Sequence, residues 1–441
     1  MLVQRRIKLK ALRLMAIVVA VGSLAGAALA TAATTRHAST AAGGTINLKI
    51  GEVVPLTGPL SSFGPSFYKA GQMAVAQANA AAKAAGYPMN ITIAEGDEGT
   101  SPTTAVSAAR QLAASGINCL IGGISTGDSV AMAQAVTIPG KLTQIAPTAS
   151  AAIYGTMHAK GHLTFRTIQT DAFQTLVLAH VMAQQLHGAK GKVVSLAGRN
   201  DAYGGPATAA FASAWKKLGG KIQGPVLYDP NATSYDSEAA KIVANHPAAF
   251  VIEDFPETYA KVGAALLRTG QFSASQLFTT SGFPAQIPKG TPPEALNGAM
   301  VVQPGSPTSG KVITTYNKAY AAFAATPKAQ QPFNTNNYDA TMLCILASAA
   351  AHSSNGAAIA KKVIPVSAPG GKAYSFLQLT SAFKALKAGK DINYEGVSGS
   401  LDLNAQGDPG AGLANVLQYK GGNLKLLHQV DYVSGKLLPV K

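Results

Sequence analysis

Six short polar stretches follow apolar segments, and their residue types suit the binding of a small anion. Hydroxyl groups beside the starts of helices can hold a carboxylate. Aromatic side chains among them could close over an apolar part of a ligand. A serine or threonine at such a turn can also serve only as a helix cap, so the prediction rests on the convergence of all six. The stretches are residues 61–63, 124–127 and 147–150 in one part of the chain and 201–203, 253–255 and 280–282 in the other.

Strands and helices in alternation must position these stretches. Alanine-rich segments of helical length lie between short, continuously apolar segments, which are typical of buried parallel strands. This alternation predicts an α/β fold with doubly wound parallel sheets, in which ligands bind beyond the carboxyl ends of the strands. Helices are expected at 67–85, 103–115 and 211–218, and strands at 47–54, 90–94, 119–121, 142–146, 192–196, 226–228, 248–252 and 277–279.

An internal repeat indicates two similar lobes. Three sequence matches occur in order: 53–58 with 193–198, then 108–121 with 239–252, and 144–145 with 277–278. The first is followed in both copies by an aromatic–glycine pair. A period of about 130 residues is too long for a solenoid and indicates duplicated domains. Two such lobes facing each other would form one cleft.

The composition excludes several classes of protein. The chain has 441 residues, 36 Lys and Arg against 20 Asp and Glu, and a hydrophobic fraction of 47%. An intrinsically disordered protein has lower hydrophobicity, and a disulfide-rich miniprotein is short and rich in cysteine. The basic residues do not form runs with interleaved aromatics, so no nucleic-acid partner is expected. The length allows two to three domains.

The first thirty residues are typical of a secretory signal peptide. They carry five basic residues and no acid, and the apolar run 15–30 ends in a small-x-small pattern at Ala28 and Ala30. That run is shorter than the roughly 20 residues that span a bilayer. We expect cleavage, a flexible spacer at 31–45, and a soluble periplasmic or extracellular protein. The route of export, Sec or twin-arginine, stays open.

The two cysteines and the scattered histidines do not suggest a metal centre. Cys119 and Cys344 each lie in an apolar segment. Two cysteines allow one disulfide, but buried free thiols are the favoured interpretation. Cysteine and histidine do not occur at metal-ligand spacing, so we expect neither a metal nor a cofactor.

The order of these segments resembles the periplasmic substrate-binding proteins of Leu/Ile/Val-type ABC importers, which have the type I periplasmic binding fold. The resemblance covers about residues 46–441. It is carried by IGEVVPLTG at 50–58, IGG at 121–123, IAPTAS at 145–150, FRT at 165–167, DAYG at 201–204, YEG at 394–396 and DLNAQGD at 402–408.

The resemblance implies a ligand site with distinct roles. One segment would hold a ligand carboxylate, a second would hold the carboxylate and an ammonium group, and aromatic side chains would cover the ligand. The residues so placed are Ser125 and Thr126; Thr148, Ala149 and Ser150; and Phe63, Tyr203 and Phe255. Glu253 and Ser281 join them as candidates because they lie in the strand-end stretches of the second lobe.

The chain departs from the amino-acid binders of this family at one loop. They place a carboxylate there to pair with the ligand ammonium, whereas residues 279–283 contain no acid. A buried ammonium without a partner would be costly. Either Glu253 or Asp254 supplies the charge, or the ligand has no ammonium group, and both options stay open.

The resemblance also implies that the chain crosses between the lobes three times, near 165–171, 301–307 and 391–397. Lobe 1 would comprise residues 46–167 and 304–392, and lobe 2 residues 168–303 and 393–441. Hinge closure would capture the ligand, an amino acid, an amide or a small or aromatic carboxylate, for delivery to an ABC importer permease. We expect a monomer without enzymatic activity.

Two alternative functions also fit parts of the sequence. Residues 123–127 fit G-x-S-x-G, the nucleophile elbow of α/β-hydrolases, and would make Ser125 the nucleophile of a secreted esterase. However, the sequence lacks an HGGG-type segment before the elbow, and its histidines lie in no catalytic signature. A ligand-sensing module with the same fold is the other alternative.

Overall fold

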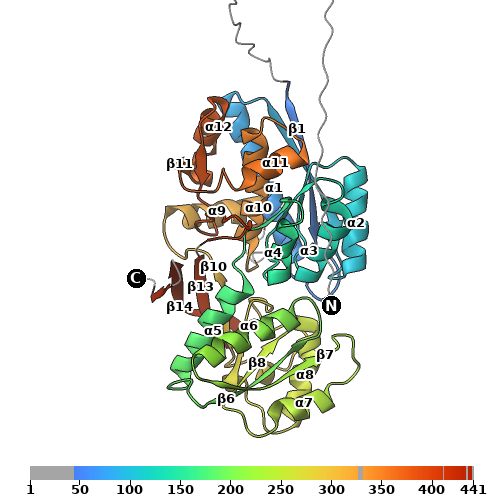
Figure 1. Cartoon of the computed structure of the whole chain (residues 1–441), viewed down its shortest axis with the longest axis vertical. Helices are drawn as coiled ribbons and strands as arrows, with labels where there is room; N and C mark the ends of the chain where they lie inside the picture. Colours follow the sequence, from blue (N-terminus) through green and yellow to red (C-terminus); the bar gives the residue numbers. More distant parts are fainter. Residues whose placement is uncertain (1–43, 326–330, 411, 434–435, 440–441) are drawn as a thin grey trace, which may run out of the picture. The chain divides into compact units, whose positions relative to one another are not determined.

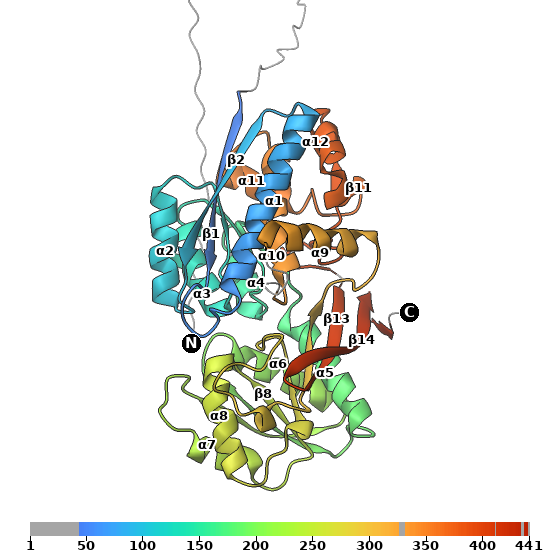
Figure 2. The ribbon, with the colours of Figure 1, turned by 180° about the vertical axis from the view of Figure 1, so that it is seen from behind.

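The computed structural model describes residues 44–325, 331–410, 412–433 and 436–439. The predicted signal peptide and nearly all of the predicted spacer lie outside these residues. Within them, two mostly parallel sheets are flanked by helices, as predicted (Figures 1 and 2). None of the helices in these ranges is long and apolar enough to cross a membrane.

The first sheet has five parallel strands in the order β2-β1-β3-β4-β5. They are β1 (Ile46–Val54), β2 (Met89–Asp97), β3 (Cys119–Ile121), β4 (Thr143–Ala146) and β5 (Thr164–Arg166). The helices between them are α1 (Gly64–Ala85), α2 (Pro102–Ala114), α3 (Thr126–Met132), which continues as a π-helix over Ala133–Thr137, and α4 (Ala152–His158).

The second sheet has eight strands in the order β15-β14-β13-β10-β9-β8-β6-β7. The five neighbouring strands β10, β9, β8, β6 and β7 are parallel. Strands β13 to β15 add an antiparallel meander, which was not predicted from the sequence. The strands are β6 (Val193–Arg199), β7 (Lys221–Tyr228), β8 (Ala249–Glu253), β9 (Leu277–Thr279), β10 (Met300–Gly305), β13 (Gly412–Lys420), β14 (Asn423–Val433) and β15 (Lys436–Pro439). The helices are α5 (Asp171–Gln185), α6 (Gly204–Lys217), α7 (Asp236–Val243) and α8 (Pro256–Arg268).

The two parallel sheets have the same strand order, in agreement with the internal repeat. Strands β6 to β10 occupy the same positions in their sheet as β1 to β5 do in theirs. In each sheet the first of these strands lies between the second and the third. The first sequence match, however, aligns the helices and not the strands. Helices α1 and α6 begin at Gly64 and Gly204, but Val53 and Val54 end β1 whereas Val193 and Val194 begin β6. The loop before α1 is therefore longer than its counterpart before α6.

Four further helices and a small sheet complete the first lobe. Helix α10 (Asn334–Ala350) is buried along nearly its whole length and packs against α1 (Figure 2). Its apolar side chains share one core with those of α1, α9 (Lys311–Ala324), α11 (Gly356–Val363) and α12 (Leu379–Lys387). The short strands β11 (Lys372–Tyr374) and β12 (Ile392–Tyr394) pair beside them.

Three connections join the two sheets. Residues 167–170 lead from β5 to α5, which packs against β9, β10 and β13, and residues 306–310 lead from β10 back to α9. After β12, Val397, Leu401 and Leu403 still belong to the core of α1 and α10. The lobe boundaries stay a prediction. We propose that the third crossing lies between Leu403 and Gly412, later than the expected 391–397.

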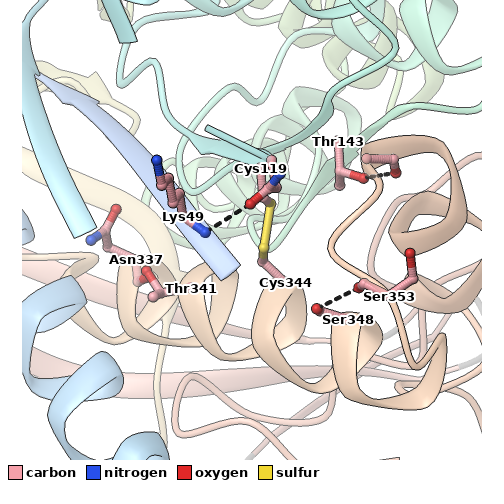
Figure 3. Close-up of a disulfide and its surroundings, with 10 residues drawn as sticks. Lys49, Cys119, Thr143, Asn337, Thr341, Cys344, Ser348 and Ser353 are labelled. Carbon is pink, nitrogen blue, oxygen red and sulfur yellow. Dashed lines mark hydrogen bonds between the residues drawn. A yellow bond between two sulfur atoms is a disulfide. The ribbon is translucent and has the colours of Figure 1, made fainter. Parts of the chain in front are cut away.

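A disulfide bond joins Cys119 in β3 to Cys344 in α10 (Figure 3). Their Cα atoms are 6.6 Å apart, and both side chains are fully buried. The prediction of free thiols is therefore wrong. It rested on the apolar sequence around each cysteine. That sequence does not reveal that α10, which carries Cys344, packs against β3, which carries Cys119.

Candidate functional site

A small cavity lies where the carboxyl ends of the two parallel sheets face each other. Its volume is about 40 Å³. Loops after β1, β3 and β4 line it from the first lobe, and loops after β6, β8 and β9 line it from the second. The lining residues are Leu60, Phe63, Phe67, Ile124, Ser125, Thr126, Thr148, Ser150, Ile168, Tyr203, Phe255, Ser281, Gly282 and Phe333.

The first lobe contributes the hydroxyl groups of two adjacent loops. Ser125 caps helix α3, and its Oγ accepts a hydrogen bond from the backbone N–H of Asp128 at 3.1 Å. Thr148 Oγ1 donates to the carbonyl oxygen of Ile124 at 2.6 Å and so ties the second loop to the first. Thr126 and Ser150 are buried beside them. The first lobe thus lines the cavity with four hydroxyls, and most of the other lining side chains are apolar.

A buried pair of carboxyl groups supports the first of these loops. Glu98 Oε2 accepts a hydrogen bond from the backbone N–H of Ile124 at 2.9 Å, and Asp128 lies next to it. Burial raises the pKa of Asp128 to about 7, and burial together with the neighbouring Asp128 raises that of Glu98 well above its usual value. The pair thus lies on the buried side of the first loop, and Glu98 holds that loop through the backbone of Ile124.

Arg166 supports the second loop from behind. Its Nη1 donates to the carbonyl oxygens of Ala149 and Ala151 at 2.8 and 3.0 Å, and its Nε pairs with Asp408 Oδ1 at 2.6 Å. The Arg166 side chain is only 2% exposed. Its backbone N–H also donates to the carbonyl oxygen of Gly407. Arg166 therefore links the loop at the cavity to the segment that leads into the third crossing.

The second lobe contributes aromatic rings. Tyr203 and Phe255 stack with ring centroids 4.8 Å apart and planes 16° apart. The Arg199 guanidinium carbon lies 4.2 Å from the Phe255 ring centroid on the same stack. Arg199 is held in turn by Asp201 Oδ2 at 2.7 Å and Thr258 Oγ1 at 2.9 Å. The rings therefore form a supported, apolar cover over the cavity.

The neighbouring acids Glu253 and Asp254 differ in how their oxygens are used. Asp254 accepts hydrogen bonds from Tyr228 Oη at 2.8 Å and from the backbone N–H of Phe255 at 2.7 Å, and Arg199 lies 3.6 Å away. Its oxygens are therefore already used within the second lobe, although burial still raises its pKa to about 7.

Glu253, by contrast, has an oxygen to spare. Its Oε2 accepts hydrogen bonds from Tyr203 Oη and Thr280 Oγ1, at 3.0 and 2.5 Å, but its Oε1 is buried without a partner among the described residues. Burial raises the pKa of Glu253 to about 7, and Asp171 contributes to that rise through its charge. Burial likewise raises the pKa of Asp171 to about 6.

The structure brings most of the predicted site residues to one cavity. All of them except Ala149 and Glu253 line it. Ala149 presents its carbonyl oxygen to Arg166, and Glu253 lies behind Tyr203. Ile124 and Gly282 also line the cavity and lie in the stretches 124–127 and 280–282 that were predicted to do so, whereas the apolar lining residues Leu60, Phe67, Ile168 and Phe333 were not predicted. Phe67 lies one helical turn after the predicted Phe63, but the sequence contains no sign that Phe333, which directly precedes α10, reaches this site.

The surroundings of Ser125 are those of a helix cap. Its Oγ accepts from Asp128 N, and its carbonyl oxygen accepts from the hydroxyl of Ser129 at 2.9 Å. Its nearest titratable groups are carboxyls and not an imidazole. Across the described ranges, His, Cys, Asp and Glu side chains form no group of three that could hold a metal ion.

The fold and this cleft define a two-lobed solute-binding protein of the type I periplasmic class. A family model described as "Periplasmic binding protein" matches residues 47–423, so the chain belongs to that family. Ser125, Tyr203 and the other lining residues all fall within the matched range.

Several known proteins are similar to this chain in sequence or in fold. The Leu/Ile/Val-binding protein homolog 3 of Brucella melitensis is 31% identical over 174 residues, which is 39% of this chain but only 45% of that relative's length. The LivJ substrate-binding protein of Streptococcus pneumoniae, solved with isoleucine, is 17% identical over 89% of this chain and all of its own, with a TM-score of 0.68. A Rhodopseudomonas palustris solute-binding protein, solved with benzoate, is 18% identical over 87% of this chain and 96% of its own, with a TM-score of 0.64. These structures share the fold of this chain.

Proposed function

We propose that this protein captures a small carboxylate ligand between its two lobes and delivers it to an ABC importer in the membrane. The observation that carries the proposal is the cavity, which has hydroxyl groups on the first lobe and aromatic rings on the second. A ligand would contact the first lobe through Ser125, Thr126, Thr148 and Ser150. Closure would bring Tyr203 and Phe255 onto it, and these contacts would stabilise the closed form that the importer recognises.

The ligand of this site has a carboxylate and an apolar body. The lining contains four hydroxyls at one end, no Lys or Arg, and mostly apolar side chains elsewhere. Hydroxyl donors in a water-poor cavity can hold an anion through charge-assisted hydrogen bonds. The proteins of similar fold that were solved with isoleucine and with benzoate carry ligands of this general kind.

We further propose that the ligand carries an amino group that pairs with Glu253. Asp254 is already satisfied by Arg199, Tyr228 and a backbone N–H, whereas Glu253 Oε1 has no partner among the described residues. A buried carboxylate without a cation is costly, and a ligand ammonium would remove that cost. Glu253 thus takes the role that the loop around Ser281 cannot fill.

Export fits this function. Disulfide bonds form and persist in oxidising compartments outside the cytoplasm, and Cys119 is bonded to Cys344. The predicted signal peptide supports the same compartment, so we propose that the mature protein works as a monomer at the outer side of the cytoplasmic membrane.

A thermal-shift screen against amino acids, amides, urea and aromatic acids, followed by calorimetry, tests the proposal. We expect a ligand that raises the melting temperature and binds one to one. The matched pair leucine and 4-methylpentanoate then tests the amino group, because only leucine can pair with Glu253. If 4-methylpentanoate and benzoate bind more tightly than any amino acid, the amino-group proposal is wrong while the capture function stands.

A fluorophosphonate probe tests the esterase alternative. Stoichiometric labelling that is lost in Ser125→Ala would contradict the proposed function, because a helix-capping serine has no reason to react.

A further inference from the structure

One face of the first lobe carries lysines almost without acids. The helices α1, α11 and α12 each place lysines in their last turn: Lys83; Lys361 and Lys362; Lys384 and Lys387. Lys390 follows α12, and all six side chains are exposed. We call these six residues the lysine face. Between the buried Asp339 and Asp391 the sequence contains no acid, so Asp391 is the acid that lies nearest to the face along this segment.

The lysine face is contiguous. Lys362 and Lys390 line one shallow hollow, together with Asp391. Lys387 Nζ donates to the carbonyl oxygen of Gly86 at 2.7 Å, and Gly86 is the residue that ends α1 after Lys83. Lysines in a last helical turn also offset the helix dipole, but that effect acts on each helix singly. It does not explain why three helix ends meet on one surface.

The chain enters the folded unit beside this face. The backbone N–H of Ile46, at the start of β1, donates to the carbonyl oxygen of Pro88 at 2.8 Å, two residues after Gly86. Both views show the start of β1 at the same end of the first lobe as α12 (Figures 1 and 2). The residues before Ile46 include the predicted signal peptide, which is expected to be cleaved during export across the membrane. The mature chain therefore enters its fold at the end that carries the lysines.

We propose that the lysine face binds the anionic lipid headgroups of a membrane surface. Exposed lysines are attracted to an anionic bilayer, and clusters of about four to eight of them are typical of surfaces that bind anionic lipids. The face lies at the start of β1 and β2, whereas the ligand cavity lies at the carboxyl ends of these strands. Attachment therefore leaves the cleft accessible to solute and keeps the protein near a membrane transporter.

Vesicle co-sedimentation tests this proposal with the full chain as the cell processes it. The probes are vesicles of phosphatidylcholine alone and of phosphatidylcholine with about 30% phosphatidylglycerol, enough anionic lipid for electrostatic attraction. We expect binding to the mixed vesicles only, and weaker binding as salt screens the charges. The variant Lys361→Glu, Lys362→Glu, Lys384→Glu should weaken that binding by about a hundredfold or more, the loss expected when three lysines at the surface are replaced.

A matched variant controls for net charge and helix stability. Lys216 and Lys217 also lie in the last turn of a helix, α6, and Lys221 begins β7 in the second lobe. Replacing these three by Glu changes the net charge equally but leaves the lysine face intact. If only nearby charges matter, lipid binding should stay within about twofold of wild type. An equal loss in both variants, or no binding to anionic vesicles by the wild type, would overturn the proposal. A circular-dichroism melt of each variant confirms that it is folded, and a Lys→Gln version of each replaces any that is not.

Discussion

The two lobes meet the cavity with different surfaces. The first lobe presents the hydroxyls of two loops, and each loop is held from behind by a buried ionisable side chain, Glu98 or Arg166. The second lobe presents the stacked rings of Tyr203 and Phe255, with Arg199 against the stack. The first surface can orient a carboxylate, whereas the second can cover an apolar body and has Glu253 behind its rings. The strand orders of the two lobes are alike, so the difference lies in the loops.

This contrast assigns separable roles to the lobes. If the first lobe holds the charged group of the ligand, changes there should lower the affinity most. If the second lobe covers the ligand and supplies Glu253, changes there should alter the pH dependence and the preference for an apolar body.

The largest effect is expected from Arg166→Met. The change leaves Asp408 without its cation and removes the donors to Ala149 and Ala151. Breaking a buried ion pair costs about 3 kcal/mol or more, so the free energy of unfolding from urea denaturation should fall by about that amount. Arg268→Met is the control, because Arg268 and Asp236 form an exposed pair whose loss should cost below about 1 kcal/mol. Equal losses would show that Arg166 does not support the loop as described.

The double change Thr126→Ala and Ser150→Ala tests the first lobe directly. Loss of two charge-assisted hydrogen bonds should weaken binding by about 3 kcal/mol, which is more than a hundredfold in the dissociation constant from calorimetry. Thr156→Ala is the matched control, because that hydroxyl is exposed on α4 and bonds only its own helix. Unchanged affinity in the double variant would place the carboxylate elsewhere.

Glu253→Gln should change how stability depends on pH. The folded-state pKa of about 7 lies above the ordinary value of 4.5, so the folded protein keeps a proton that the unfolded chain releases. The free energy of unfolding of the wild type therefore falls as the pH rises from about 4.5 to about 7, and this contribution is absent in the variant. By about pH 8 the ligand-free variant should gain about 1–3 kcal/mol relative to wild type.

Urea denaturation at pH 5 and pH 8 measures that difference. Glu294→Gln, at an exposed acid of the same lobe, should show no such gain. Parallel pH profiles for Glu253→Gln and wild type would mean that Glu253 is not held as the buried acid described above.

The smallest effect is expected from Phe255→Leu. The change keeps an apolar side chain over the cavity but removes the stack with Tyr203 and the contact with Arg199. Affinity should fall by about 1 kcal/mol, and by more for an aromatic ligand than for an aliphatic one. Leu227→Ala, at an exposed position of β7, controls for a general loss of stability. A loss larger than that of the Thr126 and Ser150 double variant would reverse the comparison between the lobes.

The sequence predicted eight of the ten parallel strands in the two large sheets because their patterns are local, and it missed β5 and β10. The predicted bounds of β3 and β9 agree with the structure, and helix α1 begins three residues before its expected start. Buried parallel strands are continuously apolar and stand between alanine-rich helices, so each can be recognised without its partners. The cavity residues Ser125, Tyr203 and Phe255 were predictable for the same reason, since they follow recognisable strands.

The rest depends on partners that are distant in sequence. The role of Arg166 requires Asp408, 242 residues away, and the bond of Cys119 requires Cys344. Phe333 precedes α10 with a left-handed backbone, φ 69°, and no pattern around it predicts a position in the cavity. The antiparallel strands β13 to β15 also escaped prediction, and β13 alternates between buried and half-buried residues, unlike continuously buried parallel strands such as β3.

The disulfide bond has a consequence for how the chain behaves when it is cut. Cys119 and Cys344 are 225 residues apart, and the segment between them contains the parallel strands of the second lobe and the two connections around them. The disulfide thus closes a covalent loop that begins and ends in the first lobe and includes the main segment of the second lobe. A protease that cleaves one exposed loop of that segment yields two fragments that stay linked until a reductant is added, so a nicked molecule keeps both walls of its cleft on one covalent assembly.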